Sequence, residues 1–248
     1  MAVATTTGGK GRRKPQENWM IHYTKPGRYR DNGIVYHISD YAKATGKQCL
    51  TILDVGCSKA VADKVMKADL EKLGLQPYLF GVDVDKGMEG MAKQNLDLFM
   101  GSDIRDLRIY DLPLSDVVIC SNVAVWVDGQ ASYEIVKRCA EQLKDDGVLV
   151  TNAFKFPRFP LLERKSCPRL LCESAHSLEN GLRPFLSEYQ RRKKEDCKLM
   201  SKAIYGRSEA MAYARTVWDS WNVLSEDSKT KWKSTIKKRQ SWIHRHLN

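Results

Sequence analysis

The sequence lacks the features that would place it in a membrane or in an oxidising compartment. No stretch approaches the roughly 18 consecutive apolar residues that span a bilayer, and the N-terminal MAVATTTGGKGRRK has no apolar core of a secretory signal. The seven cysteines include no C-x-x-C pair, and several lie in apolar patterns where a reduced thiol packs as a small hydrophobe. We therefore expect a soluble, intracellular protein of the cytoplasm or nucleus, with no membrane partner.

Glycine is scarce at the one place where a phosphate-binding loop would need it. The stretch LTILDVGCSKAVADKV, residues 50–65, begins as an apolar strand, breaks at Gly56 and continues into helix-forming residues. A strand that feeds a helix through a glycine turn often meets a ligand in α/β folds. One glycine where a dinucleotide fold has three makes this turn a poor cradle for phosphate.

The centre of the chain alternates apolar strand patterns with helical patterns. Strands are predicted for LTILDV, YLFGVDV, LDLFMGSD, DVVICSN and GVLVTNAF, the last following an Asp146-Gly147 turn. Helices are predicted for about 58–73, 86–95 and 130–144. Strands this apolar, separated by helices, imply an α/β fold with a parallel sheet covered on both faces.

The flanks differ from the centre, and we divide the chain into four segments. Residues 1–16 are expected to be a disordered basic tail, and 17–49 an aromatic-rich segment that acts as a lid or strap, with a helix at about 35–44. Residues 50–156 form the α/β core. Residues 157–248 are expected to be a mainly helical basic lobe, with helices at about 178–199, at 207–223, and from an N-cap at Ser225 to about 246.

Charge separates the same segments. Residues 1–49, 50–154 and 155–248 carry net charges of +6, −6 and +11 within an overall +11. An acidic centre between two basic flanks indicates that the flanks meet a polyanion, although lysine and arginine on solvated helix faces would give a similar count.

Five motifs occur in order through the centre: ILDVGCS, GVDVD, GSDIRDL, DVVICSNVAVWV and AEQLKDDGVLVTNAF. Together they resemble the ordered motifs of class I S-adenosylmethionine-dependent methyltransferases, which implies a Rossmann-like sheet with helices on both faces. The family fold ends in an antiparallel strand hairpin. No two strand patterns follow Phe159, so a helical lobe replaces the hairpin, or short strands lie in segments such as RPFLSEY and KLMSKAIYG.

The resemblance implies S-adenosylmethionine as cofactor, no metal, and contacts at the carboxyl ends of the strands. It places Asp54 near the cofactor's ammonium, the alternative being a carboxylate that caps the next helix. It gives the ribose hydroxyls to Asp83, with Asp85 as the competing residue, and the adenine amino group to Asp103. The complete set of expected cofactor contacts is Asp54, Gly56, Cys57, Ser58, Asp83, Val84, Asp103, Ile104, Ser121 and Asn122.

The first turn departs from the glycine pattern of the family. Gly56 lets the backbone pass close under the methionine part of the cofactor because it has no Cβ. The family's further glycines are replaced by Ser58 and Ala60. Serine is a familiar variant at its position, whereas Ala60 has no explanation in the sequence.

Catalytic residues are harder to assign, because in-line methyl transfer from a sulfonium needs alignment more than any one side chain. The candidates are Asn122 and Lys155. Lys155 is either part of the active site or simply the first residue of the basic flank. No Asp/Asn/Ser-Pro-Pro-aromatic motif follows the fourth strand, no Pro-Cys nucleophile occurs, and the Asp of a ribose 2′-O-methyltransferase tetrad is missing.

Acceptor binding is assigned to the flanks. Basic runs interleaved with Trp232 and Trp242 predict phosphate contacts and stacking for RNA, unless the tryptophans belong to the core of an amphipathic helix. A small-molecule methyltransferase with an aromatic lid, and a catalytically silent RNA-binding or regulatory module, are the alternatives. Trp126 either walls the cleft or belongs to the core. The candidate acceptor contacts are Tyr29, Tyr36, Trp126, Arg191, Arg192 and Lys193.

Overall fold

The computed structural model describes residues 25–31, 33–121, 123, 127–152 and 202–247. Strands and helices alternate through the centre of the chain. The strands are β1 (Cys49–Val55), β2 (Gln76–Val82), β3 (Leu98–Met100), β4 (Ser115–Cys120), β5 (Leu143–Asn152) and β6 (Lys202–Gly206). The helices are α2 (Arg28–Asp31), α3 (Ile34–Thr45), α4 (Val61–Lys72), the 3-10 turn η1 (Lys86–Met88), α5 (Glu89–Asn95), α6 (Gly129–Glu141), α9 (Arg207–Asn222) and α10 (Glu226–Leu247).

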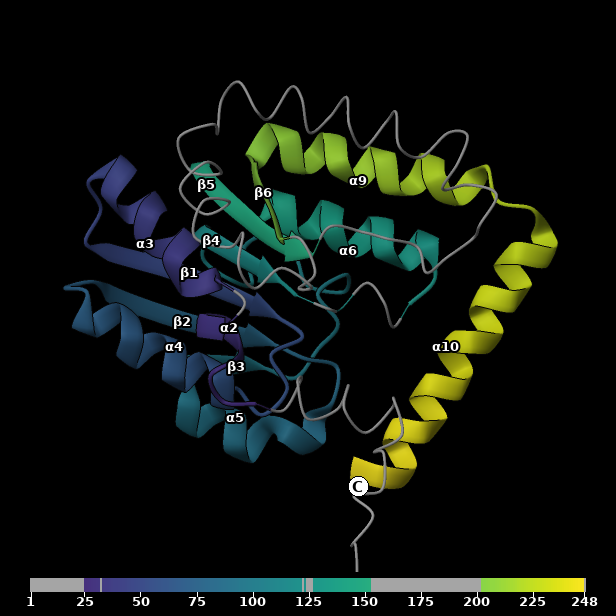
Figure 1. The fold of residues 1–248 in the computed structure, drawn as a ribbon, viewed down its shortest axis with the longest axis horizontal. Helices are drawn as coiled ribbons and strands as arrows, with labels where there is room; N and C mark the ends of the chain where they lie inside the picture. The colour runs from purple at the N-terminus through teal and green to yellow at the C-terminus, as the bar shows by residue number, and fades with distance from the viewer. Residues whose placement is uncertain (1–24, 32, 122, 124–126, 153–201, 248) are drawn as a thin grey trace, which may run out of the picture.

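The strands form one sheet in the order β3-β2-β1-β4-β5-β6 (Figure 1). The pairings from β3 to β5 are parallel, and β6 runs antiparallel to β5. The winding reverses between β1 and β4, which is where open α/β sheets leave a crevice at the carboxyl ends of the strands. The prediction of a Rossmann-like, mostly parallel sheet is confirmed.

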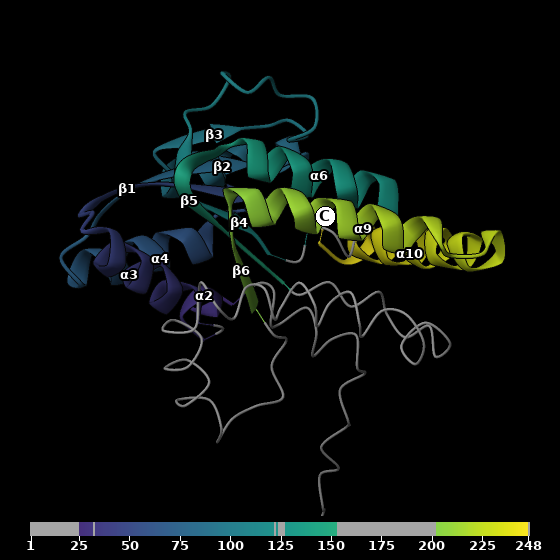
Figure 2. The same ribbon diagram turned by 90° about the horizontal axis from the view of Figure 1, so that it is seen from above.

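Helices cover both faces of the sheet, as the apolar strands require (Figure 2). On one face, α2, α3, α4 and α5 contribute to a core that includes Ile38, Met66 and Leu70. On the other face, α6 and α9 pack against each other and against the sheet, around Val136 and Val217. Burial of these two apolar layers supplies the main stabilisation of the fold.

Several helix ends follow the local chemistry expected of them. Gly33 (φ 83°) and Gly46 (φ 70°) flank α3, in the left-handed conformation that glycine adopts without strain. Asp128 caps α6 by accepting a hydrogen bond from the Ala131 N–H at 3.0 Å. Ser225 precedes α10, and its hydroxyl accepts from the Ser228 N–H at 3.3 Å, which confirms it as the N-cap. The helices predicted at about 35–44 and 207–223 are also confirmed.

The fifth strand begins earlier than predicted. β5 starts at Leu143, and its pairing with β4 shifts register between Ser115 and Val117, so the Asp146-Gly147 pair lies inside an irregular strand instead of in a turn before it. A Cβ on Gly147 would lie 2.8 Å from the Ser115 carbonyl oxygen. Glycine is therefore needed at this position because two backbones approach each other closely. In the sequence alone, the same Asp-Gly pair indicates a turn.

In the C-terminal part of the chain, β6 adds the last strand to the sheet, and two helices follow it. β6, which lies in the KLMSKAIYG segment, pairs with β5 and places Lys202 opposite Asn152. α9 then returns across α6, where Trp221 packs so closely on Gly129 that no Cβ would fit there. The sheet and its covering helices thus extend beyond the expected core boundary at residue 156, and α10 extends away from them. The predicted tail at 1–16 and the helix at 178–199 lie outside the described residues.

Candidate functional site

The loop between β1 and α4 has an unusual backbone. Gly56 (φ 76°), Ser58 (φ 55°) and Ala60 (φ 52°) are all left-handed. L-residues pay about 1–2 kcal/mol for this conformation, which glycine adopts freely. The three left-handed residues alternate along the loop, so the positions where the family has glycine are those where the backbone requires it. For the same reason α4 begins at Val61 and not at Ser58 as predicted.

Gly56 is required by its neighbour as well as by its dihedral angle. A Cβ there would lie 2.5 Å from Cγ2 of Val123, in the segment after β4. Its N–H donates to the Val82 carbonyl at 2.7 Å, at the end of β2. The glycine therefore joins the carboxyl ends of β1, β2 and β4 at one point. Cys57 is buried, and burial raises the pKa of its thiol, so it packs as an apolar side chain.

Asp54, the penultimate residue of β1, is buried in a polar cluster. Its carboxylate accepts a hydrogen bond from the Tyr29 hydroxyl, and that hydroxyl accepts from an Arg28 guanidinium N–H at 2.7 Å. Arg28 Nη2 is 4.0 Å from Asp54 Oδ2. Burial raises the pKa of Asp54, while Arg28 and the Tyr29 hydroxyl act in the opposite direction. Tyr29 was expected among the acceptor contacts; it is instead 1% exposed and supports Asp54 from within the protein.

A second carboxyl group, Asp63 in the first turn of α4, lies beside Asp54. Asp63 is 1% exposed, and its carboxyl group shares a hydrogen bond with that of Asp54. Burial and then the neighbouring Asp54 carboxylate hold the pKa of Asp63 well above its usual range, so it carries the proton of the pair. Sequence reasoning missed this residue. Its spacing from Met66 and Leu70 puts it on the apolar stripe of α4, which was the available signal.

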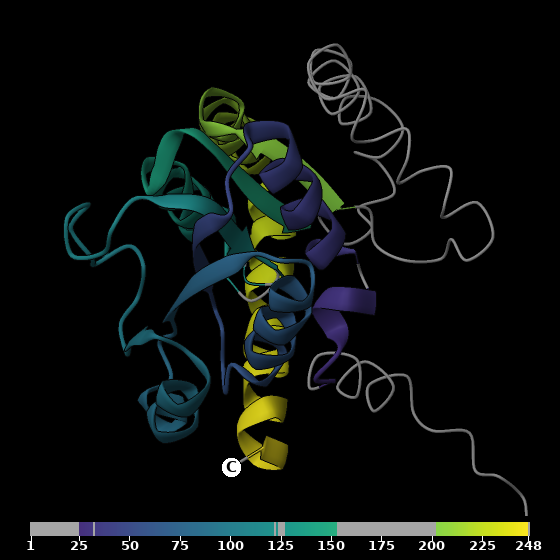
Figure 3. The same ribbon diagram turned by 90° about the vertical axis from the view of Figure 1, so that its left-hand side faces the viewer.

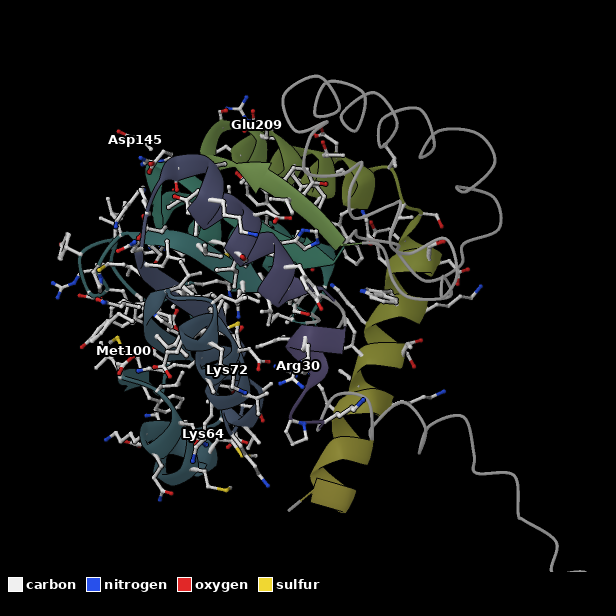
Figure 4. The ribbon with its side chains drawn as sticks, turned by 60° about the vertical axis from the view of Figure 1, so that its left-hand side comes forward. Arg30, Lys64, Lys72, Met100, Asp145 and Glu209 are labelled. Atoms are coloured by element: carbon white, nitrogen blue, oxygen red, sulfur yellow. The ribbon has the colours of Figure 1, made fainter. Side chains whose placement is uncertain are left out.

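Helix α2 is held at this site by an exposed ion pair as well as by the buried contacts of Tyr29 and Arg28 with Asp54. Arg30 makes a bidentate pair with Asp69 of α4, at 2.7 and 2.6 Å. Figure 4 shows Arg30 beside α4, on whose surface Lys64 and Lys72 also lie. Tyr36, the other tyrosine expected to contact the acceptor, is on α3 and is 50% exposed. Part of the aromatic N-terminal segment is therefore a fixed wall of the site.

Asp83 and Asp85, at the end of β2, have different structural roles. Asp83 accepts the Ser58 N–H on one carboxylate oxygen at 2.8 Å and the Asp85 N–H on the other at 2.9 Å. Asp85 caps η1 by accepting from the Gly87 N–H at 2.9 Å. Asp83 thus ties the β1 loop to the end of β2, whereas Asp85 serves the local turn; Asp83 as the ribose ligand stays a prediction. Val84 next to it is 66% exposed.

Asp103 follows β3 and is already engaged with a cation. Arg105 Nη2 and Nε lie 2.6 and 3.0 Å from its carboxylate, and Arg105 also pairs with Glu134 of α6 at 3.4 Å. The hydrogen bond from Arg105 holds the pKa of Asp103 below its ordinary value, so Asp103 remains an acceptor near neutral pH. Ile104 is buried in the core below it.

The end of β4 is described only in part. Ser121 is buried and Val123 contacts Gly56, while the Val127 carbonyl accepts the Trp232 indole N–H of α10 at 3.3 Å. Trp232 is 3% exposed, so it belongs to the core and is not a stacking surface. The remaining predicted contacts lie outside the described residues: Asn122, Trp126, Lys155, Arg191, Arg192 and Lys193.

The opposite edge of the sheet carries a hollow of about 660 Å³ between the start of β5 and the start of α9. Ion pairs occupy its surroundings, with Arg207 2.5 Å from Asp145 and Lys47 2.6 Å from Asp146. It lies at the amino ends of the parallel strands, far along the sheet from the β1 loop. No helix among the described residues is long and apolar enough to cross a membrane.

Comparison with known proteins finds a family match in the central part of the chain. Residues 53–151 match the family model described as "Methyltransferase domain". No curated protein matches the chain in sequence. A sugar N-methyltransferase from Streptoalloteichus aligns with 63% of this chain and 61% of its own, at 18% identity and a TM-score of 0.44. A magnesium protoporphyrin IX methyltransferase from Synechocystis, solved with bound S-adenosylmethionine, aligns with 58% of this chain and 72% of its own, at 18% identity and a TM-score of 0.41.

A third solved structure, PKMT2 from Rickettsia typhi in complex with AdoHcy, aligns with 44% of this chain at 21% identity and a TM-score of 0.37. The chain spans 22% of the length of that protein and 61% of the Streptoalloteichus one, in each case less than two thirds.

The family match over residues 53–151, the strand order and the acids at three neighbouring strand ends agree with a class I S-adenosylmethionine-dependent methyltransferase domain. The residues fit the cofactor: Gly56 leaves no room for a side chain, Asp83 keeps acceptor capacity on both oxygens, and two carboxyl groups lie behind the loop. A cationic methionine end suits this acidic loop, whereas a phosphate would not.

Proposed function

We propose that the protein transfers a methyl group from S-adenosylmethionine to a nucleic acid, most favourably RNA, which docks on the basic helix α10. The observation that carries this proposal is the exposed lysine face of α10 beside the carboxyl ends of the strands. Phosphates bind such faces through charge, and a methyl acceptor must reach the same edge of the sheet as the cofactor.

The charge of α10 is concentrated beyond its first turn. Its two acids, Glu226 and Asp227, pair with Lys229 at 2.8 Å and Lys231 at 2.5 Å. Three solvent-exposed lysines follow, and none of them forms an ion pair with another described residue: Lys233, Lys237 and Lys238. Trp232 and Ile236 form the buried seam, so these lysines point away from the protein. The helix is thus amphipathic, and its outer face is cationic.

The position of α10 supports the same proposal. Figures 1 and 3 show it passing the carboxyl ends of the strands, in yellow. The hydrogen bond from Trp232 to the Val127 carbonyl holds the first third of α10 against the segment after β4, the segment whose Val123 contacts Gly56. A strand of RNA bound along α10 would therefore lie beside the reacting edge.

Catalysis by this site rests on alignment. The bound cofactor supplies an electrophilic methyl group on a sulfonium. Asp83 would hold the ribose, Asp54 the ammonium end, and the ordered β1 loop would fix the methyl group relative to the β4 end. Such positioning supplies a large part of the acceleration of a bimolecular displacement.

A small-molecule acceptor is the second candidate. The observation in its favour is the tight packing of α2 on the cofactor loop through Tyr29, Arg28 and Arg30, which narrows the site from the N-terminal side. The relatives named above that act on a sugar or a porphyrin are compatible with such an acceptor.

Two experiments separate the candidates. Methyl transfer from labelled S-adenosylmethionine into the RNA, protein and small-molecule fractions of a cell extract identifies the acceptor class, and we expect label in RNA. RNA affinity should also fall steeply with salt. Label in the small-molecule fraction alone, with RNA binding that does not respond to salt, would contradict an RNA acceptor.

A pair of charge-matched variants tests the role of α10. Lys233→Gln/Lys237→Gln removes two lysines from the outer face of α10, and Lys64→Gln/Lys72→Gln removes two exposed lysines from α4. We expect the first variant to reduce the salt dependence of RNA binding, the slope of log K against log salt, by about 1.4, as for two phosphate contacts with a single strand. The α4 variant should leave the slope unchanged.

A further inference from the structure

The buried cluster behind the β1 loop contains more negative groups than positive ones. Asp54 and Asp63 lie together, and Arg28 is the cation that acts on both. Arg28 is 8% exposed and already serves the Tyr29 hydroxyl at 2.7 Å and Asp54 at 4.0 Å. Burying a second ionised carboxyl group without a partner is strongly unfavourable, so the cluster needs either a proton or another cation.

Asp63 is the group in which this shortage of positive charge is visible. Both of its oxygens are buried, at the first turn of the helix that follows the cofactor loop, and the side chain with which its carboxyl group shares a hydrogen bond is another acid, Asp54. Two buried carboxyl groups in contact disfavour a second negative charge unless a further cation is near. A ligand cation at the Asp54 side of the loop would provide that cation.

The groups around Asp63 come from every element packed on α4. α2 contributes Arg28 and Tyr29, β1 contributes Asp54, and the loop contributes Cys57. Asp83, beyond the end of β2, acts on Asp54. α3 buries His37, and the charged pair of α5, Glu89 with Lys93, is exposed. Arg28 is the cation that bears on Asp63, so the remaining positive charge has to come from a proton or a ligand.

We propose that Asp63 is a second carboxylate of the ammonium subsite, which holds a proton in the cofactor-free protein and releases it to solvent when S-adenosylmethionine binds. This inference rests on the proposed function of the site as a methyltransferase. The charge balances: one ammonium enters, one proton leaves, and no covalent bond to carbon changes. Asp63 is thus a positioning residue, acting on the cofactor together with Asp54.

The experiment is calorimetry of cofactor binding to the full chain at pH 6.0, in two buffers with different ionisation enthalpies. At this pH the α-amino group of the ligand, with an ordinary pKa of about 7.7–8.0, is already charged and contributes little to proton exchange. The difference in binding enthalpy between the buffers gives the number of protons released. We expect release approaching one proton with S-adenosylmethionine and with S-adenosylhomocysteine, which carry the same ammonium.

Two controls isolate the origin of the proton. Methylthioadenosine lacks the amino-acid part, so it should bind without proton release. Asp63→Asn keeps the size of the side chain but has no proton to lose, so it should bind S-adenosylmethionine without release. Glu71→Gln, on the exposed face of the same helix, should release as the wild type does.

The outcomes are distinct. Binding of S-adenosylmethionine with no proton release by the wild type, or unchanged release by Asp63→Asn, would overturn this inference and leave the methyltransferase function intact. No binding at all would overturn both. If Asp63→Asn does not fold, the pH dependence of wild-type affinity decides: between pH 5 and 7 it should tighten by up to tenfold per pH unit, and a flat profile would overturn the inference.

Discussion

The β1 loop and the helix α10 use charge in opposite ways. Behind the loop, Asp54, Asp63 and Arg28 are buried, few, and each bears on the others. Along α10 the lysines are exposed and repeated. A buried charge depends on a specific partner, so its loss is expensive. An exposed charge interacts through water with many other charges at once, so its removal changes the free energy only slightly. The two regions therefore suit a fixed small cation and an extended anion respectively.

The largest loss of stability is expected at Gly56, the glycine at which the β1 loop turns. Gly56→Ala should lower the free energy of unfolding by about 2–4 kcal/mol, because it adds a left-handed L-residue and a clash with Val123. Urea denaturation gives the value. Gly46→Ala is the matched control, since Gly46 is also left-handed (φ 70°) but has nothing within 4 Å of the added Cβ. Equal losses in the two variants would show that the contact with Val123 has no energetic consequence.

Tyr29→Phe tests whether the buried Asp54 carboxylate depends on the hydrogen bond that the Tyr29 hydroxyl donates to it. The change leaves Asp54 buried without that hydrogen bond and should cost about 1–3 kcal/mol, again measured by urea denaturation. Cofactor affinity should weaken in parallel. Tyr205→Phe, in a buried ring stacked on Tyr213 with centroids 4.6 Å apart, should change stability much less.

Asp63→Asn should alter the pH dependence of stability. The folded-state pKa of Asp63 is raised above the unfolded value, so its contribution is fully present at low pH and is lost as pH rises from about 4 through the folded-state pKa. Asparagine does not titrate and avoids that loss. The variant should therefore gain stability relative to wild type as pH increases, by up to about 1.4 kcal/mol per unit. Thermal unfolding between pH 5 and 8 measures the trend, and a constant difference would contradict it.

Ser58→Gly and Ala60→Gly separate backbone strain from burial in the same loop. Ser58 is exposed, so glycine should relieve its left-handed strain and stabilise the protein by about 1 kcal/mol. Ala60 is 1% exposed, and its methyl group lies in the core. Loss of that buried methyl costs about 0.8 kcal/mol, so Ala60→Gly should be nearly neutral. A large gain at residue 60 would remove this explanation of the alanine.

The smallest effect on stability belongs to α10. Lys233→Gln/Lys237→Gln should change the free energy of unfolding by less than about 0.5 kcal/mol, because exposed lysines without partners contribute little to the fold. Urea denaturation, as for Gly56→Ala, measures the change. A larger loss of unfolding free energy would mean that these lysines have structural partners.

The sequence was sufficient for the five parallel strands, because period and apolar content indicate which segments are strands or helices, whereas β6 was left as one of two alternatives. Gly56 was also identified from sequence, although its contact with Val123 joins residues distant along the chain and has no local signal. The register shift at Gly147 and the burial of Trp232 depend on long-range packing in the same way. Acids at strand ends were found by pattern, whereas Asp63 lies inside a helix and was missed, and Tyr29 was assigned to the acceptor because its burial depends on long-range packing.

The pairing of Asn152 with Lys202 has a consequence for how the protein can vary. Asn152 and Lys202, which flank residues 153–201 in the chain, lie side by side at the carboxyl edge of the sheet on neighbouring hydrogen-bonded strands. Two residues held together by a sheet tolerate connections of different lengths between them, because each doubling of a connection costs only about 0.6 kcal/mol of closure entropy. The Asn152–Lys202 pair is thus an insertion point, at which the length of the connection can change while the cofactor edge of the sheet stays the same.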